Sequence, residues 1–310
     1  MNLLRYSLCA ALALTLGAVQ AQKKSKAAAT PAPPPMLDLS KPEDAMKANR
    51  KITSSLKDNE SCYYYWQGNV FSRVPGEKDR LLFTYIAMNT RASSTVTDPE
   101  KGYGWRHVSR EILLYQDPKT GEILKTWKNP WTGQDIDVIH IANDPVNGRG
   151  PSFAMGNDGK TPFKLSGFEK DGYWFQLNEV PLFYTNPLGG EYQDEIGGTY
   201  QAMEIFQTMT PMSELLDATK DKTENSLIAW SRVSKWLPWF KMGDKVGQMI
   251  FTGIGKKVKS FDDYPEALKN EIKTNYPIYV SAPPTDDTRP NETSWTYYKK
   301  IVAEKKKNNK

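Results

Sequence analysis

His140 and Asp144 are the residues of this chain best placed for acid–base chemistry. On a strand, His140 would share one face with Ile136 and Val138, and a polar segment with Asn143, Asp144 and Asn147 follows it. An imidazole titrates near neutral pH, and a neighbouring carboxylate can fix its tautomer. We therefore take His140 and Asp144 as candidate catalytic residues. The structural alternative is a histidine that bonds to backbone at a strand end, followed by an Asx-type turn at Asn143-Asp144-Pro145.

Arg232 is the second candidate, because it lies between tryptophans. On a strand, Trp230, Arg232 and Trp236 would share one face, since side chains alternate with a period of two. A guanidinium between indoles can stack on them and offer its donors to an anionic or carbonyl group. If this face points inward, Arg232 needs a carboxylate partner, for which Glu204 and Asp144 are candidates. If it points outward, Arg232 is a stacked surface residue. Both interpretations stay open.

Aromatic residues make up 12% of the chain, which is enough to fill a core or to line a cavity. Each buried aromatic ring covers about 150–250 Å², so several exposed rings would exceed the apolar patch of a usual monomer. The rings therefore pack in a core or surround a guest molecule. The candidate ligand-binding residues are Tyr64, Trp66, Trp131, Asn143, Asn147, Glu204, Trp230, Arg232, Trp236 and Trp239.

The sequence carries no motif typical of a metal site or a nucleotide cofactor. The two histidines and two cysteines have no metal-ligand spacing, and the glycine pairs at 189–190 and 197–198 lie among acidic and turn residues. The net charge of +5 is small and lies partly in the terminal EKKKNNK, so nucleic acid is a weak candidate partner. We expect no metal and no cofactor, and a hydrophobic or aromatic small molecule as the partner.

The segment that carries His140 is predicted to be a β-hairpin. Strands over residues 123–128 and 135–141 flank the turn NPWTG, where proline fixes φ and glycine can take a positive φ. Alternating apolar patterns between turn signals predict further strands. These cover residues 61–73, 81–91, 105–116, 163–168, 172–184, 199–208, 227–236 and 249–258.

This pattern predicts a mainly β, α+β fold built on a large antiparallel meander. Closure into a barrel is the first choice because it removes exposed edges, and a strongly curved open sheet capped by helices is the second. Peripheral helices are predicted over residues 41–56, 262–276 and 294–305. The motif Ser40-Lys41-Pro42-Glu43 has the form of a capping box for the first of them.

Four regions divide the chain. Residues 1–21 resemble a signal peptide cleaved near Ala21, and residues 22–39 form an Ala/Pro/Lys-rich disordered linker. A single β-rich domain is predicted over residues 40–303, followed by a basic disordered tail at 304–310. We expect an exported protein, periplasmic or secreted, with no transmembrane segment in the mature chain. Cleavage would leave Cys62 as its single cysteine, which cannot form an internal disulfide.

Five long motifs are distributed along the chain: YYYWQGNVFSRVPGE, REILLYQDPKTGEIL, WKNPWTG, VIHIANDPVN and WSRVSKWLPWFKMGD. Together they resemble the bacterial family catalogued as domain of unknown function 1838, over most of residues 44–273. The resemblance implies a shared fold. It carries no activity, substrate or catalytic residue over to this chain.

Three hypotheses for the function remain open. The leading one is a protein that binds a hydrophobic or aromatic small molecule in a cavity lined by tryptophans, with Arg232 and the 140–147 corner orienting its polar end. The alternative is a cofactor-independent lyase, isomerase or hydrolase that acts on such a molecule through His140 and Asp144. The third is a structural protein of the envelope without a cavity.

Overall fold

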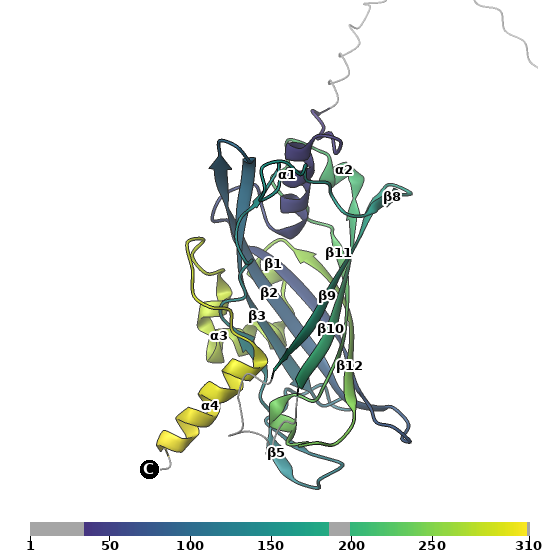
Figure 1. Ribbon diagram of the computed structural model, residues 1–310. Coiled ribbons are helices and arrows are strands. Elements are labelled where there is room, and N and C mark those ends of the chain that lie inside the picture. The colour runs from purple at the N-terminus through teal and green to yellow at the C-terminus, as the bar shows by residue number, and fades with distance from the viewer. Residues whose placement is uncertain (1–33, 186–198, 309–310) are drawn as a thin grey trace, which may run out of the picture. The chain divides into compact units, whose positions relative to one another are not determined.

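A large antiparallel sheet dominates the computed structural model, which describes residues 34–185 and 199–308 (Figure 1). Its long strands are β1 (Cys62–Arg73), β2 (Arg80–Asp98), β3 (Gly102–Gln116), β9 (Tyr173–Thr185), β10 (Thr199–Pro211), β11 (Leu227–Ser234) and β12 (Gln248–Val258). Its short strands are β6 (Ile141–Asn143), β7 (Ser152–Phe153) and β8 (Phe168–Lys170). The predicted signal peptide and most of the predicted linker lie outside the described residues.

The sheet is open. Its strand order is β6-β3-β2-β1-β12-β11-β10-β9-β8, with β7 also paired to β3. Within the described chain no ladder joins the β6 and β8 ends, so the predicted barrel is wrong and the second choice, an open sheet with helices, fits. The physical reason is that β6 and β8 are only three residues long, and helices and loops rather than strand pairing cover the inner face.

The face of β1 that carries Trp66 is called the inner face here. The register places Trp66 beside Ala87 of β2 and Gly255 of β12, so the alternation of β1 continues across its neighbours. The main core lies on this face and is rich in aromatic rings, including Phe83, Tyr115 and Phe251. At one end of the strands, residues of the 3₁₀ turn η2 (Pro238–Phe240) and of α4 (Ser294–Asn308) pack into the core. Figure 1 shows α4 at this end.

The outer face of β1 to β3 is covered by η3 (Phe261–Asp263), α3 (Glu266–Asn275) and η4 (Pro277–Val280). One helix was predicted over residues 262–276. The structure splits it at Tyr264, which is extended because it precedes Pro265. Leu268 and Ile272 point into the sheet as their spacing predicts.

Helix α1 (Pro42–Thr53) covers the opposite end of the inner face, near α2 (Met212–Leu215) (Figure 1). The predicted capping box is wrong, because the N-cap is Lys41 and the Ser40 hydroxyl donates to Asp38 instead. The fold also begins before residue 40. The Leu37 amide donates to the Leu216 carbonyl, and Met36 forms a β-bridge with Asp217.

The predicted hairpin forms, with shorter strands. β4 (Thr126–Lys128) pairs with β5 (Asp135–Asp137) as a separate two-stranded sheet, and Gly133 has φ +71°. Ile141 leaves the hairpin and pairs with Leu113 of β3 in the large sheet. Helix α4 runs to Asn308, so residues 304–308 of the predicted tail are helical.

Candidate functional site

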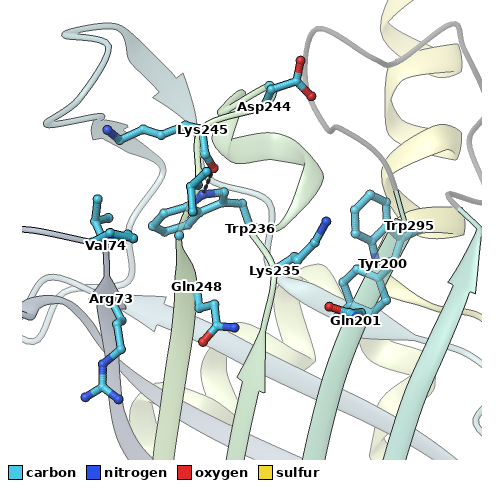
Figure 2. A pocket seen from close by; sticks show the side chains of 14 residues that line it. Arg73, Val74, Tyr200, Gln201, Lys235, Trp236, Asp244, Lys245, Gln248 and Trp295 are labelled. Carbon is cyan, nitrogen blue, oxygen red and sulfur yellow. Dashed lines mark hydrogen bonds between the residues drawn. The ribbon is translucent and has the colours of Figure 1, made fainter.

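A pocket of about 590 Å³ opens where β1, β10, β11 and β12 end, and we call it the rim pocket (Figure 2). Its walls come from the strand ends, from the loop that leads into β12 and from the first turn of α4. The lining residues are Arg73, Val74, Pro75, Tyr200, Gln201, Lys235, Trp236, Gly243, Asp244, Lys245, Val246, Gly247, Gln248 and Trp295.

The aromatic wall of the rim pocket is fixed by packing behind it. The indole of Trp236 donates to the Lys245 carbonyl at 2.9 Å and packs against Trp131, with ring centroids 5.2 Å apart. Tyr200 and Trp295 form an edge-to-face pair at 4.8 Å. These rings are already oriented, so an apolar guest would not have to order them.

The NPWTG turn explains how the sequence places Trp131. The Asn129 side chain accepts hydrogen bonds from the Trp131 and Thr132 amides, and it donates to the Phe240 carbonyl at 2.9 Å. Asn129 is fully buried and thereby ties the hairpin turn to η2. Trp131 lies behind Trp236 as a result, and its own indole donates to the Glu77 carboxylate.

Three cations and one carboxylate line the rim pocket. Arg73 is paired with Asp79 at 2.7 Å, and Lys245 lies 3.9 Å from Glu77. Lys235 forms no ion pair with any described residue. Figure 2 shows its side chain between Trp236 and Tyr200. The pocket therefore combines an aromatic wall with a positive charge that has no fixed partner in this part of the chain.

A second, smaller pocket of about 190 Å³ lies on the inner face beneath α1, and we call it the inner pocket. Its lining residues are Asn49, Ile52, Thr53, Tyr64, Arg91, Gln176, Asn178, Phe206, Thr208 and Ile228. They come from α1 and from β1, β2, β9, β10 and β11, so only the folded sheet brings them together.

Three other cations are buried near the inner pocket, and each is saturated. Arg50 is fully buried and pairs with Asp58 at 2.7 Å. The Lys51 ammonium donates to three backbone carbonyls at the C-terminal end of α2, and the Lys257 ammonium donates to three at the C-terminal end of α1. Burial lowers the pKa of each lysine to about 8. These groups hold α1 on the sheet.

The comparisons with known proteins identify a family. A family model described as "Protein of unknown function (DUF1838)" matches residues 59–302. The chain belongs to this family. No curated protein matches it. A crystal structure of a LolA superfamily protein from Nitrosomonas europaea is similar over 74% of this chain and 96% of that one, at 8% identity and a TM-score of 0.19. A superposition this loose says nothing of what either protein binds.

In this DUF1838 protein the two predicted catalytic residues make separate contacts. His140 accepts a hydrogen bond from the Tyr115 amide at its Nδ1, and burial lowers its pKa to about 4. Asp144 pairs with Arg110 at 2.6 Å and with Arg289 at 3.1 Å. No hydrogen bond joins His140 to Asp144 among the described residues. The structure therefore places His140 in a contact with backbone and Asp144 in ion pairs with two arginines.

The other predicted polar residues lie on the inner face or on its β3 edge. Arg232 points inward, and its partner is Glu204 at 2.9 Å, which is one of the two carboxylates predicted for it. Asn143 donates to Glu111, and the side-chain oxygen of Asn147 accepts from the Ser109 amide. These contacts brace β6 and the loop after it against β3.

The predicted aromatic residues separate into two groups. Trp66, Trp230 and Trp239 are packed in the core. The ring centroids of Trp66 and Trp230 are 6.4 Å apart, and those of Trp239 and Phe240 are 4.4 Å apart. Trp236 lines the rim pocket with Trp131 behind it, and Tyr64 lines the inner pocket. The structure thus does not gather the predicted residues around one cavity.

Sequence reasoning missed Lys235 and Trp295 of the rim pocket and Arg91 of the inner pocket. Lys235 directly precedes Trp236, and this neighbourhood was the available signal. Trp295 and Arg91 gave no such signal, because their partners are distant in sequence.

In the part of the chain that the structure describes, no cluster of acidic, histidine or cysteine side chains is arranged to hold a metal ion. The helices of that part are all too short or too polar to cross a bilayer.

Proposed function

We propose that this DUF1838 protein is an exported binding protein that holds a hydrophobic or aromatic small molecule with an acidic end in the rim pocket. The observation that carries the proposal is the position of Lys235 between Trp236 and Tyr200 (Figure 2). An indole wall favours an apolar or aromatic body, and an unpaired ammonium favours an anionic end. The volume of about 590 Å³ lies within the range typical of small-molecule sites.

The loop before β12 adds apolar surface to the same pocket. Val246 is 71% exposed and lines the pocket, as does the buried residue Val74. Gly247 is essential to this shape, since a Cβ at this position would lie 2.3 Å from the ring of Trp236. The absence of a side chain at Gly247 lets the indole occupy the wall of the pocket.

The first test is fluorescence titration with 1-anilinonaphthalene-8-sulfonate, an aromatic probe with one negative charge. We expect saturable binding to the folded protein and quenching of tryptophan emission. The Gly247→Ala variant should bind about tenfold more weakly, because the added methyl group displaces Trp236. The matched control is Gly150→Ala, where a Cβ meets nothing within 4 Å. Equal affinity in the two variants would contradict the proposal.

Export is the second part of the proposal and has its own test. N-terminal sequencing of the protein from the periplasmic or secreted fraction should begin near Gln22. Native mass spectrometry of the same material tests for a retained small molecule. Recovery of a chain that still begins at Met1, from the cytoplasmic fraction alone, would show that the protein is not exported.

A further inference from the structure

Arg91 is partly buried, and it differs from the buried cations Arg50, Lys51 and Lys257 because its terminal nitrogens have no hydrogen-bond partner among the described residues. It lies on the inner face of β2, with its guanidinium carbon 4.6 Å from the ring centre of Tyr64. Its Nε donates to the Asn89 side chain. Neither Nη1 nor Nη2 donates a hydrogen bond to any residue in the described ranges. Arg91 lines the inner pocket, so these nitrogens have space to reach a ligand.

No carboxylate in the described chain lies within ion-pair distance of Arg91. Glu111 is the nearest candidate by register, two residue pairs further along the β2–β3 ladder and on the same face. Its carboxyl group accepts from Asn143 at 2.7 Å. Burial also raises the pKa of Glu111, because a buried carboxyl group favours its neutral form. The positive charge of Arg91 therefore lacks a fixed counter-charge, which is unfavourable in a buried site.

The rest of the inner pocket offers further donors and an apolar wall. Gln176 of β9 lies beside Thr208 of β10 in the register, and Asn49 of α1 faces the same space. Within the described residues these three side chains form no hydrogen bond. The apolar lining residues are Ile52, Phe206 and Ile228. A small molecule with one charged end and one hydrocarbon end matches this division.

We propose that the inner pocket binds the carboxylate of a small organic acid, with Arg91 as its charged ligand. A guanidinium presents paired donors in the geometry of a carboxylate, and amide and hydroxyl groups complete the hydrogen bonds. The hydrocarbon part packs against Phe206 and Ile228. The volume of about 190 Å³ restricts the ligand to a small acid. This site shares no lining residue with the rim pocket, so it does not depend on the function proposed there.

The test is calorimetric titration of the full chain with benzoate, with the neutral benzamide and with inorganic phosphate. We expect benzoate to bind at least tenfold more tightly than benzamide, since charge-assisted hydrogen bonds to Arg91 distinguish them. Equal binding of benzoate and benzamide overturns the proposal, as does no binding at millimolar concentration. Tighter binding of phosphate than of benzoate overturns the assignment to an organic acid.

Variants locate the site. Arg91→Met should weaken the binding of benzoate about 10- to 100-fold. Arg149→Met, which removes an exposed arginine, should leave the affinity for benzoate unchanged. Lys235→Met should also leave it unchanged, which separates this site from the rim pocket. If Arg91→Met does not fold, the Gln176→Leu variant tests the site instead. It should bind benzoate several-fold more weakly than the parent protein. Unchanged benzoate affinity in Arg91→Met, or in Gln176→Leu where that variant decides, overturns the proposal.

Discussion

The cations around α1 and the cation in the inner pocket lie on the same side of the sheet and are built differently. Arg50, Lys51 and Lys257 donate their hydrogen bonds to carbonyls, hydroxyls and one carboxylate of the protein itself. Arg91 donates a hydrogen bond only from its Nε. A buried cation that stabilises a fold has all its donors bonded within that fold, whereas a cation with free donors beside a cavity is available to a ligand.

Removing a saturated cation should give the largest effect. Arg50→Met is expected to lower the free energy of unfolding by about 3–5 kcal/mol, because it leaves buried partners unpaired. These partners are the Ser55 carbonyl, the hydroxyls of Ser93, Thr95 and Tyr103, and the Asp58 carboxylate. Urea unfolding followed by circular dichroism measures the change. A loss below about 1 kcal/mol would show that the bonds to Arg50 do not hold α1 on the sheet.

Lowering the pH should destabilise the protein through the buried imidazoles of His107 and His140 rather than through these cations. Burial lowers the pKa of His107 to about 3 and that of His140 to about 4. Between about pH 6.5 and pH 5 the unfolded chain binds protons that the native state does not, so stability falls as the pH falls. The slope approaches about 1.4 kcal/mol per pH unit for each proton. Replacing both histidines by glutamine should make the free energy of unfolding depend less steeply on pH in this window. An unchanged slope would show that the two histidines do not cause the loss of stability.

Lys235 is the corresponding cation of the rim pocket, and its removal should weaken ligand binding only slightly. Lys235→Met is expected to weaken the anionic naphthalene probe by about three- to fivefold, because an exposed ion pair contributes about 1 kcal/mol or less. Lys256→Met is the matched control, since Lys256 is exposed on the outer face of β12. Fluorescence titration at low ionic strength measures both. If both variants lose affinity equally, the effect is one of net charge, and Lys235 has no particular part in binding.

The sequence was most informative where the pattern is local. The alternation in residues 61–73 and 227–236 predicted β1 and β11 nearly to their ends, and the inward position of Arg232 beside Glu204 was one of the two arrangements foreseen. The NPWTG turn was recognised from Pro130 and Gly133.

The sites depend on pairings that no local pattern contains. Arg91 becomes a pocket residue only because β2, β1, β12 and β11 follow one another in the sheet and α1 covers them. Trp295 reaches the rim pocket from α4, about 60 residues after Trp236. The barrel was predicted because closure removes edges, whereas the chain ends its sheet with the short strands β6 and β8. Spacing alone cannot distinguish these two solutions.

If Arg91 serves a ligand rather than the fold, its removal should cost little stability and should abolish the effect of a ligand. The free energy of unfolding of Arg91→Met should equal that of the parent protein within about 2 kcal/mol without ligand, because the variant loses only the hydrogen bond to Asn89 and the cation–π contact with Tyr64. Added benzoate should stabilise the parent protein and leave the variant unchanged. A loss in Arg91→Met as large as that in Arg50→Met, with benzoate stabilising both the parent and the Arg91→Met variant, would contradict the account.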